Sequence, residues 1–195
     1  MDALGETTRD VESAHRRLVA ELREHALVIG EVTLTSGSRA AYYVDAKRAI
    51  LLPKAFAALG TLIAEHARRC DARAVGGVPV SAIPVACAAL GAPGAPDKAF
   101  IVRKERKAHG LQRWIEGPLL APGERCLIVE DVVTTGGSTV AAVERVQSEG
   151  LTVAGVVSVL DRLAGGGQAI SEAIGGAPYV ALTTIDEVYP ERPDR

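Results

Sequence analysis

The chain has 195 residues, of which 48% are apolar and only 4% aromatic, so it can bury an aliphatic core and is neither disordered nor collagen-like. A formal net charge of −2 and a pI of about 6.1 exclude a globally basic surface, so we expect no nucleic-acid partner. The three cysteines match no zinc spacing, and no uninterrupted apolar stretch is long enough to span a membrane; together these features predict a cytoplasmic protein without a membrane partner.

The first part of the chain predicts two helices with an extended region between them. Apolar residues recur at helical spacing from Thr8 to Ala26, with Arg and Glu between them. Residues 27–37 show the alternation of a strand, and residues 41–50 continue in extended form after a turn. Pro53 opens a second helix, at a position that the first turn of a helix tolerates.

From residue 73 onward, short apolar strands alternate with helices. We expect strands at 73–78, 98–104, 125–131, 152–161 and 178–185, and helices at 81–90, 138–150 and 167–176. Strands that read as continuous apolar runs and alternate with helices indicate a parallel sheet covered on both faces. The pattern therefore predicts an α/β fold, and the chain length favours a single domain over residues 1–195.

The strand at 125–131 ends in Glu130 and Asp131 and runs into a loop of small residues from Thr134 to Ser138. Ligands bind at the carboxyl ends of strands in open α/β sheets. The N–H groups of such a loop, together with the positive end of the following helix, suit a phosphate. The two carboxylates would repel a phosphate but accept hydrogen bonds from hydroxyl groups. The motif therefore predicts a ribose 5-phosphate site, with the acid pair on the ribose diol.

This motif differs from the common nucleotide-binding loops. The chain contains no nucleoside triphosphate P-loop, and no Gly-x-Gly-x-x-Gly follows a strand. A tight strand-to-helix turn with Ser138 as the helix cap, binding no ligand, remains open. Such a turn does not need two adjacent acids at the end of a buried strand.

A cationic segment runs from Arg103 to Arg113, directly after a predicted strand. A solvated surface loop would account for a run of charge by itself. A reaction that expels pyrophosphate would also account for it, because Lys and Arg on a mobile loop can stabilise the charge that accumulates on the leaving group. His109 could donate a hydrogen bond or a proton to the same group.

These motifs resemble those of a known family. Residues 126–139 look like the signature of the type I phosphoribosyltransferases, which bind phosphoribosyl pyrophosphate (PRPP). The cationic segment resembles the catalytic loop of the orotate phosphoribosyltransferases in particular. Three further segments resemble that family in the same order: the N-terminal hood over the base, the pyrophosphate loop, and the strand end whose Arg meets the substrate carboxylate, at 33–45, 75–78 and 159–162.

The resemblance implies a fold and a reaction. The fold would be a mostly parallel central sheet flanked by helices, with residues from about 1–50 contributing an N-terminal helix and the hood. The reaction would transfer phosphoribose from PRPP to N1 of orotate, giving orotidine 5′-monophosphate and pyrophosphate in de novo pyrimidine (UMP) biosynthesis. Mg²⁺ is the implied cofactor, held mainly by PRPP and water with no direct protein ligand. The implied assembly is a homodimer with shared active sites.

The resemblance also assigns residues to each substrate. Lys107 is the leading catalytic candidate, together with Arg103 and His109. The PRPP ligands would be Arg103, Lys104, Lys107, His109, Glu130, Asp131, Val132, Val133, Thr134, Thr135, Gly136, Gly137 and Ser138. The orotate ligands would be Thr134, Arg162, Tyr43 and Val44. A guanidinium is a natural fork for a carboxylate, although a salt bridge from Arg162 to Asp161, or a helix cap, is the structural alternative.

The chain departs from the family pattern at two positions. Thr35 and Ser81 stand where the family often has Lys, which removes positive charge from the substrate region. We interpret this as subfamily variation, because the cationic segment and Arg162 are present. A phosphoribosyltransferase for another base is one alternative function. A non-catalytic protein that senses PRPP or binds RNA on the same fold is the other.

Overall fold

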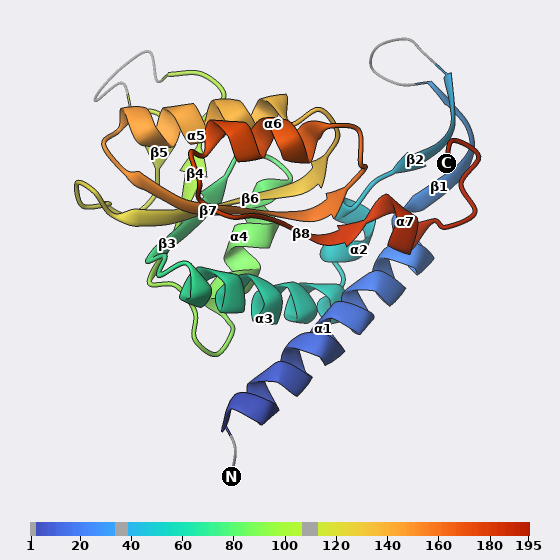
Figure 1. Ribbon diagram of the computed structural model, residues 1–195, viewed down its shortest axis with the longest axis horizontal. Coiled ribbons are helices and arrows are strands. Elements are labelled where there is room, and N and C mark those ends of the chain that lie inside the picture. The colour runs from blue at the N-terminus through green and yellow to red at the C-terminus, as the bar shows by residue number, and fades with distance from the viewer. Residues whose placement is uncertain (1–2, 34–38, 107–112) are drawn as a thin grey trace.

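The computed structural model describes residues 3–33, 39–106 and 113–195, and its centre is a six-stranded sheet (Figure 1). The strands lie in the order β5-β4-β3-β6-β7-β8. β5 pairs antiparallel with β4, and every other neighbouring pair is parallel. Their bounds are β3 Ala74–Gly77, β4 Lys98–Val102, β5 Ile115–Glu116, β6 Arg125–Val133, β7 Thr152–Asp161 and β8 Tyr179–Thr184. The mostly parallel sheet expected from the sequence is confirmed.

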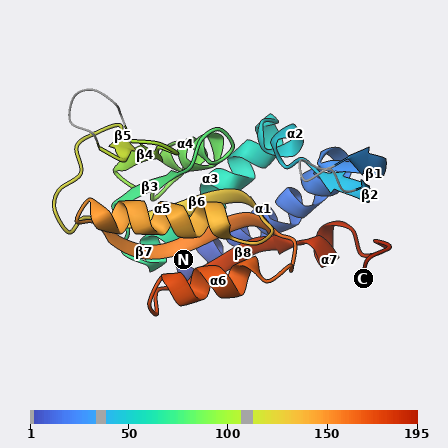
Figure 2. The same ribbon diagram turned by 90° about the horizontal axis from the view of Figure 1, so that it is seen from above.

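Helices cover both faces of this sheet (Figures 1 and 2). One face carries α1, α3 and α4, which span Ala3–His25, Pro53–Arg69 and Ala82–Leu90. The opposite face carries α5 and α6, which span Gly137–Ser148 and Gly166–Ala173. Two short helices lie near the ends of strands, α2 at Lys47–Ile50 and α7 at Ile185–Val188.

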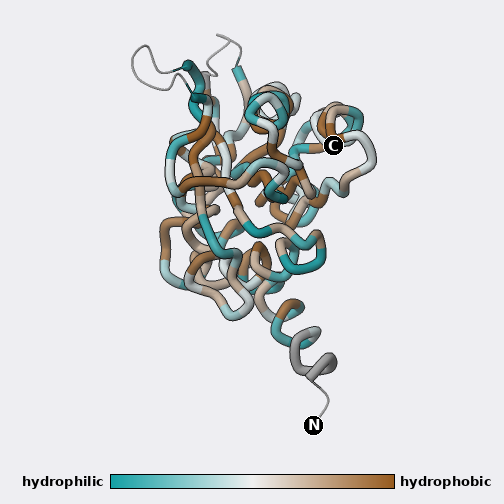
Figure 3. The backbone as a smooth tube through the Cα atoms, turned by 90° about the vertical axis from the view of Figure 1, so that its left-hand side faces the viewer, coloured by the Kyte–Doolittle hydropathy of each residue, from teal (hydrophilic) through white to brown (hydrophobic). Residues whose placement is uncertain are grey.

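The alternation of side chains along β6 explains why there are two cores. Leu127 and Val129 point to the core that contains the buried residues of α1, α3 and α4. Cys126 and Ile128 point to the core that contains those of α5 and α6. Because successive side chains of a strand face opposite ways, a strand that is apolar throughout must be covered on both faces. Figure 3, coloured by hydropathy, shows apolar stretches of the chain running through the body of the molecule.

A second, two-stranded sheet stands apart from the central one. β1 (Leu27–Thr33) pairs antiparallel with β2 (Arg39–Val44), with Leu27 opposite Val44. This hairpin lies beside α2 and the C-terminal segment (Figure 1). It corresponds to the segment expected to form the hood.

The structure adds elements that the sequence pattern did not predict. β5, α2 and α7 have four residues or fewer, too short for a periodicity to be visible. The acid pair does not end β6 as expected, because the strand continues through Val132 and Val133, which pair with Leu160 and Asp161 of β7. No helix in the described parts of the chain has the length and apolar character needed to cross a membrane.

Candidate functional site

The predicted site residues gather at one edge of the central sheet. β3 has β4 on one side and β6 on the other, and the connections α4 and α5 cover opposite faces. The order of the strands therefore reverses between β3 and β6, where open α/β sheets form a ligand-binding crevice beyond the carboxyl ends of their strands. β6 and β7 end side by side, with Val133 opposite Asp161. This edge holds the acid pair, the small-residue loop and Arg162.

Glu130 is 5% exposed and is held by the start of α5. The hydroxyls of Ser138 and Thr139 donate to its Oε2 at 3.0 and 3.1 Å. Burial raises the pKa of Glu130 to about 7, and the charge of Asp131 acts in the same direction. The two hydroxyl donors oppose this change, since they stabilise the carboxylate. Glu130 therefore ties the strand to the helix that follows it.

This environment predicts a pH-dependent stability. The pKa of Glu130 is raised above its ordinary 4.5, so between about 4.5 and 7 the native protein binds protons that the unfolded chain has released. The free energy of unfolding should therefore fall as the pH rises through this window and level off above it. Glu130→Gln removes this titration, and its amide oxygen can still accept from both hydroxyls. We expect the urea midpoint of the variant to depend less on pH than that of the wild type.

The exposed Glu144 on α5 offers a matched control. Glu144→Gln makes the same chemical change at an exposed position, and it should keep the pH dependence of the wild type. If Glu130→Gln also kept it, the raised pKa of Glu130 would be refuted.

Asp131 is 8% exposed and follows Glu130 in the strand, so its side chain projects to the opposite face. On this side lies Lys47, at the start of α2, whose Nζ is 2.7 Å from Oδ1 of Asp45. The hydrogen bond to Asp45 is the main cause that raises the pKa of Lys47, and the charges of Asp131 and Tyr43 raise it further. Lys47 thus places positive charge between the hairpin and the acid pair. The sequence analysis missed it, because a single Lys in a charged stretch carries no motif.

The small-residue loop is shaped by contact with the start of α6. Gly136 has a φ of +79°, and the N–H of Gly166 donates to the carbonyl of Thr134 at 3.0 Å. A Cβ on Gly136 would lie 2.7 Å from the carbonyl oxygen of Gly166. Thr134, Thr135 and Ser138 are exposed in this loop. The predicted phosphate loop is therefore held closely from beneath by the start of α6, while the side chains of Thr134 and Thr135 are exposed.

Gly136→Ala should destabilise the protein and weaken PRPP binding. The left-handed conformation costs a residue with a Cβ about 1–2 kcal/mol, and the contact with Gly166 adds to that cost. Gly165→Ala isolates the first effect, because Gly165 has a φ of +89° with open space around its Cβ position. Thermal unfolding and the KM for PRPP should both change more in Gly136→Ala than in Gly165→Ala. Equal effects would show that the close approach to Gly166 does not matter.

Arg162 directly follows β7, and its backbone N–H donates to the carbonyl of Val133 at 2.9 Å. Its guanidinium lies over the ring of Tyr42, with Cζ 5.4 Å from the ring centroid. The neighbouring Asp161 accepts instead from the N–H of Leu163 at 2.7 Å and from the hydroxyl of Tyr179 at 2.8 Å. The structure thus engages Arg162 with the hairpin, whereas the alternative from the sequence paired it with Asp161.

The two hairpin residues expected at the orotate ring lie on opposite faces of β2. Tyr43 is 38% exposed, whereas Val44 is buried on the same face as Tyr42. A ligand at this hairpin can therefore meet the side chain of Tyr43 or that of Val44, but not both. Strand alternation in the sequence could have given this result, and it would also have singled out Tyr42.

The cationic segment begins beside the same edge. Arg103 pairs with Glu116 of β5 at 2.5 Å, and Lys104 is exposed. Both residues line a cavity of about 530 Å³ together with Pro79 and Val80, which follow β3. This cavity brings the start of the cationic segment next to the expected pyrophosphate loop. The other two candidates, Lys107 and His109, lie outside the described residues.

Trp114 fixes the far end of this segment. Its carbonyl accepts from the N–H of Arg103 at 2.8 Å, so the two ends of the segment lie together. The guanidinium groups of Arg106 and Arg145 both lie over its ring, with Cζ atoms 5.2 and 4.8 Å from the ring centroid. Arg145 belongs to α5, so Trp114 anchors this end of the cationic segment to the helix that follows the predicted phosphate loop.

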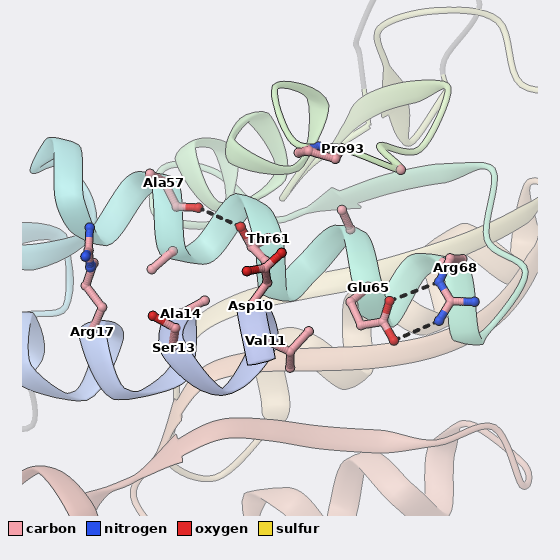
Figure 4. Close-up of a pocket in the computed structure, with 13 residues that line it drawn as sticks. Asp10, Val11, Ser13, Ala14, Arg17, Ala57, Thr61, Glu65, Arg68 and Pro93 are labelled. Carbon is pink, nitrogen blue, oxygen red and sulfur yellow. Dashed lines mark hydrogen bonds and ion pairs between the residues drawn. The ribbon is translucent and has the colours of Figure 1, made fainter. Parts of the chain in front are cut away.

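A separate cavity of about 540 Å³ lies between α1 and α3 (Figure 4). Figure 4 shows Asp10 and Arg17 on one side of it, and Thr61 and the ion pair of Glu65 with Arg68 on the other. None of the predicted site residues lines it. The candidate functional site is therefore the sheet edge, where the predicted residues gather.

Known proteins resemble this chain over most of its length. A family model described as a phosphoribosyl transferase domain matches residues 54–175. An orotate phosphoribosyltransferase of Mycobacterium avium is 49% identical over 171 residues, covering 87% of this chain and 94% of that protein. One of Corynebacterium glutamicum is 43% identical over 183 residues, covering 93% and 98%. The crystal structure of Mycobacterium tuberculosis H37Rv orotate phosphoribosyltransferase in complex with PRPP matches with a TM-score of 0.76 at 38% identity, covering 90% of this chain and 98% of that one.

Proposed function

The chain belongs to the orotate phosphoribosyltransferases, within the phosphoribosyl transferase family, and from that premise we propose how its residues carry out the reaction. The enzyme transfers the phosphoribosyl group of PRPP to orotate. The bond from C1′ of the ribose to the pyrophosphate oxygen breaks, and a bond from C1′ to N1 of orotate forms. We assign the site from one observation: Asp131, the proposed phosphate loop and Arg162 lie together at one edge of the sheet.

We propose that the carboxyl end of β6 and the loop that follows it bind ribose 5-phosphate. Asp131 accepts from the ribose hydroxyls, and the N–H groups from Thr134 to Ser138 bind the 5-phosphate at the start of α5. Glu130 supports this arrangement from the other face of the strand, through its contacts with Ser138 and Thr139. Val132 and Val133 carry the backbone from the acids to the loop.

Orotate is proposed to lie between this loop and the hairpin. Arg162 pairs with the carboxylate of orotate, Thr134 contacts the ring from the loop, and Tyr43 contacts it from β2. Val44 contributes through its backbone, since its side chain is buried in the core. The guanidinium fork makes a carboxylate-bearing base the preferred substrate.

The leaving pyrophosphate is proposed to be stabilised by the cationic segment. Arg103, Lys104, Lys107 and His109 supply positive charge and hydrogen-bond donors, with Lys107 as the leading catalytic residue. To contact the pyrophosphate, Arg103 must give up its ion pair with Glu116.

Mg²⁺ is proposed as the cofactor. When bound, it would offset the negative charge of the pyrophosphate. Mg²⁺ keeps several waters and needs only one or two carboxylates besides substrate oxygens. The residues fit this mode, because Asp131 places a carboxylate beside the proposed ribose site, where it would accept hydrogen bonds from waters of an ion held mainly by PRPP and water.

The base specificity is tested by PRPP-dependent consumption of orotate, followed by its ultraviolet absorbance, against a panel of uracil, hypoxanthine and adenine. We expect orotate to be strongly preferred, because the other bases carry no carboxylate for Arg162. A preference for a purine would support the alternative of a different base. Absence of turnover with tight PRPP binding would support a PRPP sensor.

We further propose that the enzyme is a cytoplasmic homodimer that acts in UMP biosynthesis, and that residues from about 1–50 contribute the helix and hood of a single domain. In such a dimer, the cationic segment of one subunit reaches the site of its partner, and two equivalent sites are each built from both chains.

Mixing two impaired variants should restore activity if the sites are shared. Lys107→Ala disables the cationic segment, and Asp131→Asn impairs the ribose site. After subunit exchange, each heterodimer has one site with both defects and one normal site, so random pairing should recover about a quarter of the wild-type activity. A tag on one chain verifies the exchange. A mixture no more active than its parents, despite proven exchange, would show that the segment serves its own chain.

A further inference from the structure

The C-terminal segment contacts the hairpin at the residue over which Arg162 lies. The hydroxyl of Tyr42 donates to both carboxylate oxygens of Asp194, at 3.2 and 3.1 Å. The same hydroxyl oxygen accepts from Nη2 of Arg162 at 3.5 Å. One hydroxyl group therefore links the segment after α7 to the guanidinium proposed to bind the orotate carboxylate.

Tyr42 and Asp194 are both held by further contacts. Tyr42 is 3% exposed, and its ring meets that of Tyr189 edge-on, with centroids 5.2 Å apart. Asp194 is paired with Nε of Arg192 at 3.1 Å, and Arg192 also pairs with Asp186 of α7. These contacts join β2, the end of β7 and the C-terminal segment, which are far apart in the sequence.

We propose that Tyr42 and Asp194 are positioning residues that hold Arg162 ready for the orotate carboxylate. This inference rests on the proposed role of Arg162. An arginine side chain has many rotamers, and ordering it on binding costs free energy. A ligand therefore binds more tightly when the arginine is already held in its binding position. Tyr42 contacts the guanidinium by its ring and accepts from one nitrogen. A guanidinium has five N–H donors, so a bidentate contact with a carboxylate remains compatible with this arrangement.

The placement of Asp194 indicates that it helps to position Arg162 and does not compete with the orotate carboxylate for it. The Tyr42 hydroxyl lies between the Asp194 carboxylate and Arg162, and the only contact that joins the two side chains in the described structure passes through it. The carboxylate thus orients the Tyr42 hydroxyl with its lone pairs toward Arg162. Removing either group should loosen the guanidinium without removing its charge.

Steady-state kinetics with both substrates test the proposal on Tyr42→Phe and Asp194→Ala. Tyr42→Phe keeps the buried ring and loses the hydroxyl, and Asp194→Ala changes an exposed residue of the C-terminal segment, so its folding is not at risk. Each should raise the KM for orotate by about threefold to tenfold, the range for losing one hydrogen bond, with kcat and the KM for PRPP nearly unchanged. The double variant should match the single ones, because both act through Arg162. Glu191→Ala, which removes an exposed charge from the same segment, is the matched control and should behave as wild type.

The outcomes separate this proposal from the function on which it rests. If Arg162→Ala raises the KM for orotate and neither Tyr42→Phe nor Asp194→Ala does, only the positioning role is refuted. If Arg162→Ala leaves that KM unchanged, the proposed function of Arg162 fails first. A lower KM for orotate in Asp194→Ala would mean that the C-terminal segment competes with the substrate. Equal rises in both KM values with a lower melting temperature would mean a purely structural role, and both of these results overturn the proposal.

Discussion

Replacing Arg162 with alanine should raise the KM for orotate about thirtyfold or more and leave the KM for PRPP nearly unchanged. Removing one partner of a desolvated charge pair costs about 2–5 kcal/mol. Arg162 is only partly buried, so we expect the lower end of this range, and about 2 kcal/mol corresponds to about thirtyfold. Initial rates with each substrate varied in turn give both constants.

Arg162→Lys is the matched variant for this experiment. Lysine keeps the positive charge and loses the planar fork that binds both carboxylate oxygens. Its KM for orotate should lie between those of the wild type and Arg162→Ala. If orotate and PRPP were affected equally by Arg162→Ala, the assignment of the carboxylate to this residue would be wrong.

Replacing Asp131 with asparagine should lower kcat/KM for PRPP by about tenfold to a hundredfold. A hydrogen bond to a charged group contributes about 1.5–3 kcal/mol, and the amide keeps the shape of the carboxylate without its charge. Asp131 is almost fully buried at the site edge, and its neighbour Lys47 would lose a favourable charge as well. The measurement is the initial rate at limiting PRPP.

Asp97 provides a control at the opposite edge of the sheet. It lies immediately before β4, where its carboxylate is 61% exposed and pairs with Arg73. Asp97→Asn also removes one negative charge, but it should leave the kinetics unchanged. Kinetics that were unchanged in Asp131→Asn as well would take the acid pair out of the site.

The same acid pair shows which features of the site the sequence pattern could predict and which it could not. The motif around Glu130 and Asp131 predicted two equivalent acids on the ribose hydroxyls. The structure separates them, because adjacent residues of a strand face opposite sides. Glu130 is occupied by Ser138 and Thr139, which are eight and nine residues further on and approach it only when the loop turns into α5. The motif predicted a site at these two residues, and the strand geometry distinguished one from the other.

By itself, the sequence determined the α/β class and the mostly parallel sheet, and it predicted a phosphate loop after β6. These features depend on apolar periodicity and on residues that are close in the chain, so they are visible in a single sequence. The tertiary structure alone decided that Tyr42, Arg162 and Asp194 meet, that Lys47 lies near Asp131, and that Arg103 pairs with Glu116. Most of these contacts join residues tens of positions apart. They depend on how the hairpin, the sheet edge and the C-terminal segment pack against one another, and no local pattern of residue types specifies that packing.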